Sequence, residues 1–525
     1  MFKNKIIGAI LGTGLCLFTT TSCQDITDLQ PADAFSEATA FSSPQRVALA
    51  VIGMYDAAQS GTFAGGQVRG YPFGSANVQQ SEMRGEDMLN QALFFAITNE
   101  GTYTPFSANN VWMWNTLFRL VNQCNVTIEG VKKAATDGII AQDLSLGYEA
   151  EARFLRALAY HELLTHFARP FADNNGSSLG MPIRDFAVNS PVTVDQAVST
   201  GRSTVAENYT FILTDLDFAE TNLPATRAGN LRVFRSVKGA AIALKTRVKL
   251  HRQDWAGVIA EGNKIVSAAA PFTSPISGFA LLPTAAGPFQ NQASAEAVFS
   301  IENSAQDNPG VNGSLAGMLG NPALGGRGLV RISPVSFNLQ EWPAADARRA
   351  LLTVDARSYY TGKYTDYTNR SDSNPIIRYA EVLLNLSEAI ARTSAEVVSP
   401  RALALLNALR GRGLATAVYS ADAFTTKVDF VKAILIERRI ELLAEGRRWA
   451  DIHRLAPEAA YTTGGIPAKM AFGNATFATY NFLTPPTLNR TIPAIPYSDH
   501  RFLWPIPADE VSRNPTLAKQ QNPGY

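Results

Sequence analysis

The sequence predicts a mainly α-helical protein, in which pairs of helices stack on one another and irregular, loop-rich segments with short strands extend from the stack. Apolar residues recur at helical spacing wherever the sequence is regular. Long stretches rich in Gly, Pro, Asn and aromatic residues separate these regular segments. At 525 residues, with 46% hydrophobic and 17% charged residues, the chain is long and apolar enough to form a large core.

The first half of the chain contains four apolar stripes that each indicate one buried face of a helix. The first stripe consists of Trp114, Phe118, Val121 and Ile128. Further stripes run through 205–219, 237–248 and 255–266. The last two are separated by a few polar residues, which predicts a helical hairpin. We therefore expect Trp114 and Trp255, which lie on stripes, to be core residues.

The same spacing returns near the carboxyl end, in 379–390 and 436–443. A helix pair with one apolar face cannot bury that face alone, so several short-looped pairs predict a tetratricopeptide-like stack of about four pairs. We expect this scaffold to occupy roughly 40–60, 110–268 and 375–455.

Three segments do not follow the helical pattern, namely 61–109, 270–345 and 457–505. Loops of this length in a compact protein are usually functional or pack as a subdomain of their own. Within the second segment, Ala297–Ile301 reads as a short strand. These excursions are therefore the first place to look for a binding site.

The amino terminus resembles a lipoprotein leader. Lys3 and Lys5 precede an apolar run from Ile6 to Phe18, which has the length of a signal-peptide core and is too short for a permanent membrane span. Small residues then precede Cys23, the expected site of cleavage and acylation. We predict a signal peptide at 1–22 and a single domain at 23–525.

The predicted anchor is Cys23, and two or three acyl chains on it would hold the protein firmly to a membrane. Asp25 and Asp28 follow closely, and an acidic stretch there resembles the surface-export signal of Bacteroidetes-type lipoproteins. We therefore expect an outer-membrane location facing the cell exterior. Ordinary secretion with a chance cysteine is the alternative, because Thr20 stands where lipoproteins usually have Leu.

Composition argues against several classes of function. Of three cysteines, Cys16 and Cys23 belong to the leader region and Cys124 stands alone, so neither a disulfide framework nor a cysteine-based zinc site is expected. Loss of the leader, with its two lysines and no acid, changes the formal charge from +1 to −1, which gives no strong field for nucleic acid. The sequence 176–180 matches a nucleophile elbow, but its Asn, Asp and Pro neighbours indicate a surface turn. We predict no catalytic residue, no metal ligand and no cofactor.

A dense run of charges lies between Glu437 and Asp451. Glu441 and Glu445 are one helical turn apart, as are Arg447 and Asp451, so the charges can pair along and between packed helices. We interpret this run as a structural ion network. Arg378, Glu381 and Glu388 take the same interpretation.

Sugar recognition needs flat aromatic faces beside amide, carboxylate and guanidinium groups. The first excursion offers both kinds of group, and a second candidate set consists of aromatic residues. The candidate ligand-binding residues are Tyr71, Arg84, Asp87, Asn90, Tyr103, Phe106, Phe337 and Trp342, with Tyr359 and Tyr360 beside the last two. Each of these residues has an alternative role as core of a loop-rich subdomain.

Several segments, in order, resemble the SusD-like (RagB/SusD) family of outer-membrane nutrient-binding lipoproteins. They cover nearly the whole chain after the leader: Glu149–Phe167, Ala243–Ala269, Pro375–Ala389, Leu405–Arg412, Ile434–Leu455 and Pro505–Tyr525. The resemblance implies a scaffold of four tetratricopeptide-like pairs with a variable loop-rich subdomain. It also implies a protein without catalytic activity that holds a glycan or another nutrient above a SusC-like TonB-dependent barrel.

Two other functions stay open from the sequence. A surface glycoside hydrolase would need two carboxylates facing each other across a cleft, and the sequence singles out no such pair. A purely structural or adhesive surface lipoprotein would bind no soluble oligosaccharide. The identity of the ligand does not follow from the residues, because starch-like, fructan, host or plant glycans and peptides all fit.

Overall fold

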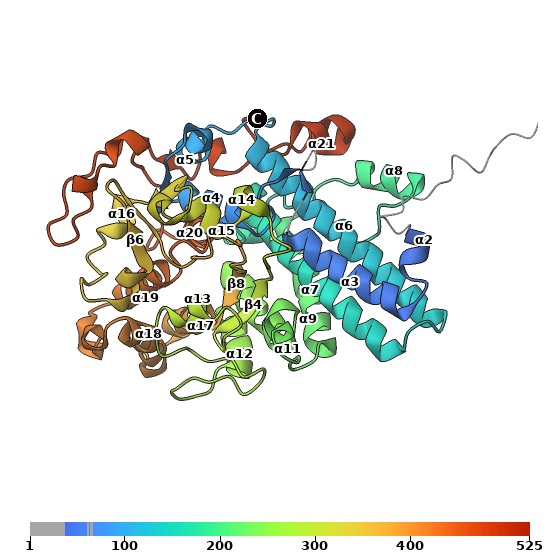
Figure 1. Ribbon diagram of the computed structural model, residues 1–525, viewed down its shortest axis with the longest axis horizontal. Coiled ribbons are helices and arrows are strands. Elements are labelled where there is room, and N and C mark those ends of the chain that lie inside the picture. The colour runs from blue at the N-terminus through green and yellow to red at the C-terminus, as the bar shows by residue number, and fades with distance from the viewer. Residues whose placement is uncertain (1–36, 60–61, 64–66) are drawn as a thin grey trace, which may run out of the picture.

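The computed structural model describes residues 37–59, 62–63 and 67–525. The predicted leader and Cys23 lie outside the described residues. The described chain is mainly helical, and its strands form two-stranded sheets. The predicted fold class is confirmed. The helices stack from the right of Figure 1 along its lower part to the left, and a loop-rich region with short strands lies above the left part of this stack.

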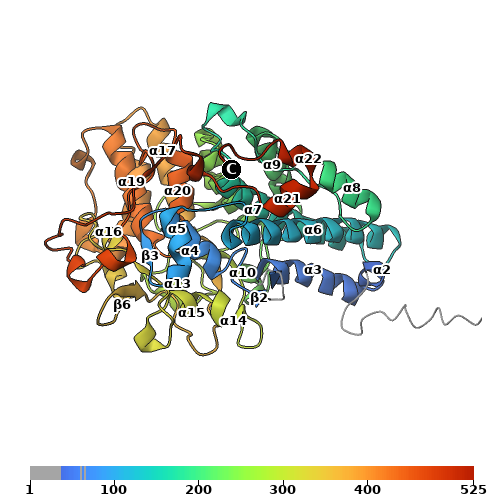
Figure 2. The ribbon, with the colours of Figure 1, turned by 90° about the horizontal axis from the view of Figure 1, so that it is seen from above.

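The scaffold consists of helices that pack side by side along the stack. They are α3 (Pro44–Gln59), α6 (Ala108–Thr136), α7 (Gln142–Phe167), α9 (Val205–Asn222), α11 (Lys238–His251), α12 (Trp255–Ile265), α17 (Tyr379–Thr393), α18 (Pro400–Gly413), α19 (Lys427–Glu441) and α20 (Arg448–Leu455). α3 packs on α6, α6 on α7, α7 on α9, α9 on α11, α11 on α12, and α12 on α17. α17 then packs against both α18 and α19, and α20 packs on the short helix Ser75–Arg84. Figures 1 and 2 both show α3 lying along α6. One continuous apolar core fills this stack.

The predicted hairpin of α11 and α12 is confirmed. Gln253 adopts a left-handed conformation (φ 60°), and the side chain of Asp254 caps α12 by accepting a hydrogen bond from the Gly257 amide at 2.9 Å. The expectation for the two tryptophans is met in part. Trp114 is fully buried, whereas Trp255 begins α12, is only half-buried and packs beneath the guanidinium of Arg392.

Five antiparallel strand pairs stiffen the loop-rich region. They are β1 (Thr62–Phe63) with β2 (Gln67–Val68), β3 (Met88–Asn90) with β5 (Val330–Ile332), β4 (Ala297–Ile301) with β8 (Asn374–Arg378), β6 (Leu352–Val354) with β7 (Tyr359–Thr361), and β9 (Gly465–Ile466) with β10 (Ile495–Pro496). The predicted strand at 297–301 is thus confirmed as β4. A second apolar core lies between this region and the end of α19.

Short helices complete the molecule. They are α2 (Glu37–Ala40), α4 (Ser75–Arg84), α5 (Ala96–Glu100), α8 (Pro191–Ser199), α10 (Leu231–Phe234), α13 (Gly287–Gln290), α14 (Gly310–Gly313), α15 (Leu315–Leu319), α16 (Pro334–Phe337), α21 (Ala508–Arg513) and α22 (Pro515–Ala518). The interpretation of 61–109 as non-helical is corrected by α4, which is buried along its whole length. Its sequence, SANVQQSEMR, has few apolar residues and no apolar stripe, although Val78 and Met83 belong to the second apolar core.

The predicted ion network is confirmed, and it joins the helix stack to the loop-rich region. Glu441, at the end of α19, lies 2.6 Å from Arg412 of α18, 2.9 Å from Arg378 of β8 and 3.3 Å from Arg348, which precedes β6. Glu445 pairs with Lys363 at 2.6 Å. All of these side chains are at most 8% exposed. These charges therefore hold structural elements together inside the protein.

A second part of the same network lies between α11, α17 and α20. Glu381 receives a bidentate guanidinium from Arg247, with hydrogen bonds of 2.7 and 2.6 Å. Arg454 binds Glu388 through two hydrogen bonds of 2.8 Å. Arg447 does not pair with Asp451 as its spacing suggests; its Nη2 donates to the Ile376 carbonyl. The charges on these helices thus pair mainly between elements.

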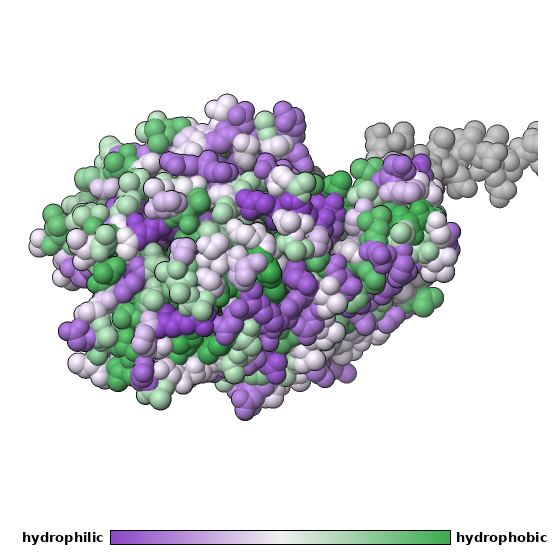
Figure 3. Space-filling view, turned by 90° about the horizontal axis from the view of Figure 1, so that it is seen from below, coloured by the Kyte–Doolittle hydropathy of each residue, from purple (hydrophilic) through white to green (hydrophobic). Residues whose placement is uncertain are grey.

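The surface carries polar and apolar residues side by side (Figure 3). Among the described residues, no helix is both long enough and apolar enough to cross a lipid bilayer.

Candidate functional site

A small surface pocket forms where the first and second excursions meet. It lies between α4, the beginning of α6 and the α14–α15 segment, and it has a volume of about 30 Å³. The residues that matter for its chemistry are Arg69, Tyr71, Gln79, Gln80, Trp112 and Asn312, and we call it the Trp112 pocket. Gly70 allows the two excursions to approach, because it has a φ of 76° and a Cβ there would lie 2.6 Å from the Gly313 carbonyl oxygen.

Trp112 provides an aromatic face at the pocket. It is half-buried in the first turns of α6, whose neighbouring residues Met113 and Trp114 are fully buried and fix the helix. The ring of Tyr71 meets the indole edge to face, with centroids 5.9 Å apart. The guanidinium carbon of Arg69 lies 5.7 Å from the indole centroid. The ring is therefore held in one orientation from two sides.

Amide groups lie beside this ring. Gln79 and Gln80 are neighbours on α4, and the Gln80 Nε2 donates to the Tyr71 hydroxyl. Among the described residues, the Oε1 atoms of Gln79 and Gln80 have no hydrogen-bond partner, although both side chains are at most 2% exposed. A buried acceptor without a partner costs free energy. A donor from a ligand or from water would remove that cost.

The opposite rim comes from the second excursion. Asn312 accepts a hydrogen bond from the exposed guanidinium of Arg327, which also lies 3.8 Å from the Met318 sulfur. On the α6 side, Asn109 donates to the Thr98 hydroxyl at 2.8 Å. The pocket thus combines an aromatic face, neutral amides and guanidinium groups. This set suits a neutral ligand with apolar faces and several hydroxyl groups.

Of the eight predicted ligand-binding residues, all of which the structure describes, Tyr71 alone lines the Trp112 pocket. Burial raises the pKa of its hydroxyl, which keeps the group neutral. Phe106 is 81% exposed. Apart from Phe106, the predicted residues are at most 5% exposed, so most of them take the alternative role of subdomain core.

The polar candidates Arg84, Asp87 and Asn90 are engaged inside the protein. Arg84 lies 3.5 Å above the Trp449 ring and donates to the Phe502 carbonyl at 2.8 Å. The Asp87 carboxylate accepts a hydrogen bond from the Arg439 Nε at 2.8 Å. Asn90 belongs to β3 and donates to the Ala92 carbonyl at 3.1 Å. Arg84 and Asp87 thus bind partners far away in the sequence, which local spacing does not reveal, whereas Asn90 binds a neighbour two residues on.

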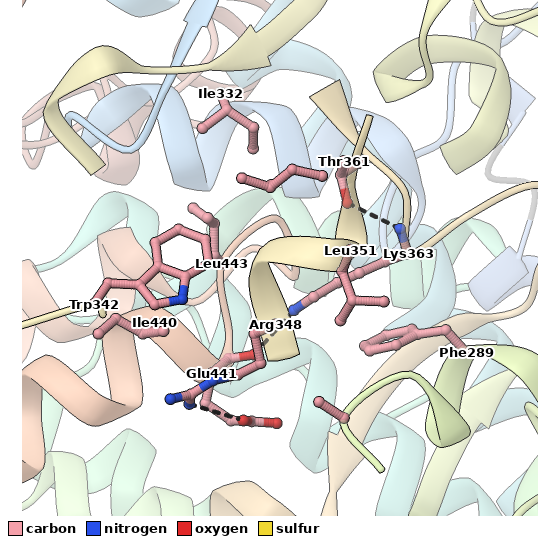
Figure 4. A pocket seen from close by; sticks show the side chains of 12 residues that line it. Phe289, Ile332, Trp342, Arg348, Leu351, Thr361, Lys363, Ile440, Glu441 and Leu443 are labelled. Atoms are coloured by element: carbon pink, nitrogen blue, oxygen red, sulfur yellow. Dashed lines mark hydrogen bonds and ion pairs between the residues drawn. The ribbon is translucent and has the colours of Figure 1, made fainter. Parts of the chain in front are cut away.

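The aromatic candidates Tyr103, Phe337 and Trp342 also pack internally. The ring centroids of Tyr103 and Trp504 lie 5.2 Å apart, and those of Phe337 and Tyr359 lie 4.4 Å apart. Figure 4 shows Trp342 beside Ile440 and Leu443 at an internal cavity of about 10 Å³. That space holds about one water molecule, so no sugar ring fits there.

Trp112, Gln79, Gln80 and Asn312 were not predicted as site residues. One signal for Trp112 was present, because Trp114 lies on the core stripe of the same helix. A residue two positions away points to nearly the opposite side of the helix. The glutamines and Asn312 carry no such signal, since their placement depends on how two distant loops meet.

Comparison with known protein families assigns two long segments of the chain. A model described as the SusD family matches residues 339–525, and a model described as "Starch-binding associating with outer membrane" matches residues 28–250. The chain belongs to the SusD-like family. Neither of these two models covers 251–338, the segment that supplies Asn312 to the Trp112 pocket.

Individual relatives agree with this assignment. A SusD-like protein P2 from Formosa agariphila is 28% identical over 72% of this chain and 74% of its own length. A SusD superfamily protein from Bacteroides fragilis superposes with a TM-score of 0.72 and 24% identity, covering 91% of this chain and 99% of its own. Surface glycan-binding protein A from Bacteroides thetaiotaomicron, in complex with laminarihexaose, superposes with a TM-score of 0.65 and 16% identity over 91% and 99%. The SusD-like fold predicted from the sequence is thereby confirmed.

Proposed function

We propose that the protein is a lipid-anchored binding protein of the outer cell surface, which captures an oligosaccharide or a similar nutrient in the Trp112 pocket. It passes the ligand to a TonB-dependent outer-membrane barrel of the SusC type. The family membership, the description of its amino-terminal half as starch-binding and associated with the outer membrane, and the glycan-bound structural neighbour support this function.

The observation that carries the proposal is the pairing of one aromatic face with neighbouring amide oxygens that lack partners. The apolar face of a sugar ring stacks on the Trp112 indole, and its hydroxyl groups donate to the Oε1 atoms of Gln79 and Gln80. The pocket volume of about 30 Å³ is smaller than a sugar ring, so only hydroxyl groups of the sugar enter it and the ring lies across its mouth. A long glycan then extends over the surface in both directions.

The residues of the pocket favour binding over hydrolysis. No carboxylate is among the described residues that line it. A glycoside hydrolase requires an acid and a second carboxylate roughly 5–9.5 Å apart across the scissile bond. The Trp112 pocket therefore holds a glycan without the groups that cleave it, and we propose that the protein is not an enzyme.

Substitution of Trp112 tests the binding site. We expect Trp112→Ala to weaken glycan binding at least tenfold, because a stacked aromatic anchor dominates such a site. The measurement is isothermal titration calorimetry of the purified protein with a panel of soluble polysaccharides and oligosaccharides. Thermal unfolding of the same variant reports whether the fold is intact.

Trp255→Ala is the matched control, since Trp255 is also half-buried on a scaffold helix but lies away from the pocket. Its affinity for the glycan should equal that of the unchanged protein. Equal affinities for Trp112→Ala and Trp255→Ala would exclude the Trp112 pocket as the site. If the protein released new reducing ends from the polysaccharide, it would be a hydrolase and the binding function would be wrong.

The anchor is tested separately. Cys23→Ala should release the protein from the membrane fraction, because acyl chains on that thiol supply the hydrophobic attachment. Fractionation followed by immunoblotting measures the release. The glycan affinity of the released protein should stay unchanged, which separates the anchor from the binding site.

A further inference from the structure

A second and larger pocket opens at the carboxyl end of α3. It has a volume of about 310 Å³ and lies between α3, α10 and the segment that follows β4. This volume reaches the range of small-molecule sites, whereas the Trp112 pocket does not. We call it the acidic pocket, for the carboxylates of Asp56, Glu302 and Asp307 that line it.

A buried amide oxygen is directed into the acidic pocket. The Nε2 of Gln59 donates to the carbonyl oxygens of Glu302 at 2.8 Å and Asp307 at 3.2 Å. These two acceptors fix the orientation of the amide, because a flipped amide would set its oxygen against them. Within the described residues the Gln59 Oε1 has no hydrogen-bond partner, although the side chain is only 4% exposed. The pocket thus contains a preset acceptor that awaits a donor.

The charges around the pocket are negative on balance. Its one lining cation, Arg235, is neutralised by Glu151, to which its Nε and Nη2 donate at 2.8 and 2.5 Å. Partial burial and the nearby Asp307 raise the pKa of Glu302. The carboxylates of Glu302 and Asp307 therefore repel each other, and a positive charge near both would relieve that repulsion.

Apolar side chains form the remaining wall. Ile52 of α3 and Leu231 of α10 are 52% and 48% exposed, and Phe234 lies behind them. Exposed aliphatic groups beside carboxylates suit a ligand that has a hydrocarbon portion and a cationic end. A neutral sugar would not relieve the repulsion between Glu302 and Asp307.

We propose that the acidic pocket binds a small organic cation, with an ammonium group held by the carboxylates and a carbon skeleton packed on the apolar wall. The two sources of such a group are an amino sugar with a free amine and a basic amino-acid side chain. This site is independent of the Trp112 pocket, and the proposal does not rest on the glycan-binding function.

Calorimetry of the purified protein at low ionic strength tests the proposal, because salt screens charges near the surface. The probes are glucosamine, Nα-acetyl-lysine amide and the neutral N-acetylglucosamine. We expect one of the two amines to bind and N-acetylglucosamine not to bind. Which amine binds identifies the source, an amino sugar or a basic side chain. Binding by neither amine, or equal binding by N-acetylglucosamine, overturns the proposal.

The double variant Glu302→Gln/Asp307→Asn locates the site. Removal of these two carboxylates should weaken the binding of the amine about fivefold to tenfold. Glu396→Gln, which removes an exposed carboxylate elsewhere, should leave the affinity unchanged. Trp112→Ala should also leave it unchanged, so failure of this site and failure of the glycan site are distinguishable. An unaltered affinity in the double variant overturns the assignment to this pocket.

Discussion

Two polar regions of this protein differ in how their side chains are partnered. In the buried ion network, each oxygen of Glu296, Glu437, Glu441 and Glu445 lies within 3.3 Å of a cationic side chain. In the Trp112 pocket, two glutamine oxygens are equally buried and lack a partner among the described residues. Charge density alone therefore does not mark a site. Paired groups stabilise the fold, and unpaired acceptors beside an aromatic face are available to a ligand.

The largest expected effect comes from opening the ion network. Arg378 lies 2.6 Å from Glu296, 2.9 Å from Glu441 and 2.7 Å from Glu445. Arg378→Met would leave three buried carboxylates without their shared cation. We expect the free energy of unfolding to fall by about 3–5 kcal/mol. Denaturant unfolding followed by circular dichroism measures the loss.

A surface ion pair provides the control for that variant. Lys133 and Asp137 lie 2.6 Å apart, with Lys133 74% exposed. Lys133→Met should leave unfolding unchanged, because solvent screens such a pair. If Arg378→Met behaved like Lys133→Met, the network would not be the structural element that its geometry indicates.

A pH series should distinguish the stability of the helical scaffold from binding in the Trp112 pocket. His161 and His251 lie in the scaffold with ring centroids 4.7 Å apart, and His453 is buried nearby. Burial is the main cause that lowers the pKa of His161 and of His453 to about 3, and it also lowers the pKa of His251. In the unfolded chain each imidazole has a pKa near 6.5. The fold therefore keeps these rings neutral where the unfolded chain protonates them.

The sign of the pH effect follows directly. The stability that these histidines contribute is complete above about pH 6.5 and is lost as the pH falls from about 6.5 towards 3. At pH 5 the expected loss is on the order of 2 kcal/mol each for His161 and His453. Thermal unfolding between pH 7.5 and 5 measures it. Glycan binding in the Trp112 pocket depends on neutral amides and an indole, so the affinity should stay constant over the same range. A flat stability profile would contradict the buried, neutral histidines.

The sequence was sufficient for elements whose burial follows a regular repeat. The stripe that begins at Trp114 predicted α6, and the polar break near Asp254 predicted the α11–α12 hairpin, because a helix packed on one side repeats its apolar residues. α4 escaped prediction, since most of its buried residues are polar and its sequence therefore shows no apolar repeat. The spacing also predicted that the charges of α19 and α20 are structural, although the partners came from distant elements.

The candidate site was predictable to a smaller degree. The sequence identified the two excursions that meet at the pocket and identified Tyr71 among its residues. It also selected Arg84 and Trp342, which the structure places in the interior. Arg84 stacks on Trp449 and Trp504, which lie more than 360 positions later in the chain. No local pattern reports such a contact, so residue type alone does not separate a ligand contact from a core contact.

The smallest expected effect compares one amide from each region. Gln79 and Asn385 are each 1% exposed. Asn385 donates to the Thr246 hydroxyl at 3.1 Å and accepts from Arg438 at 2.8 Å, whereas the Gln79 oxygen has no partner in the part of the chain that the structure describes. Asn385→Leu should therefore lower the free energy of unfolding by about 1–3 kcal/mol and leave glycan affinity unchanged.

Gln79→Met keeps the length of the side chain and removes the unpartnered oxygen. The free energy of unfolding should stay the same or rise slightly, because no hydrogen bond of that oxygen is lost in the free protein. Glycan affinity should fall about fivefold, the loss of one hydrogen bond to a hydroxyl group. Calorimetry and thermal unfolding of the two variants side by side measure both quantities. If Gln79→Met destabilised the protein as much as Asn385→Leu and bound the glycan normally, the amides of the Trp112 pocket would belong to the fold, like the ion network.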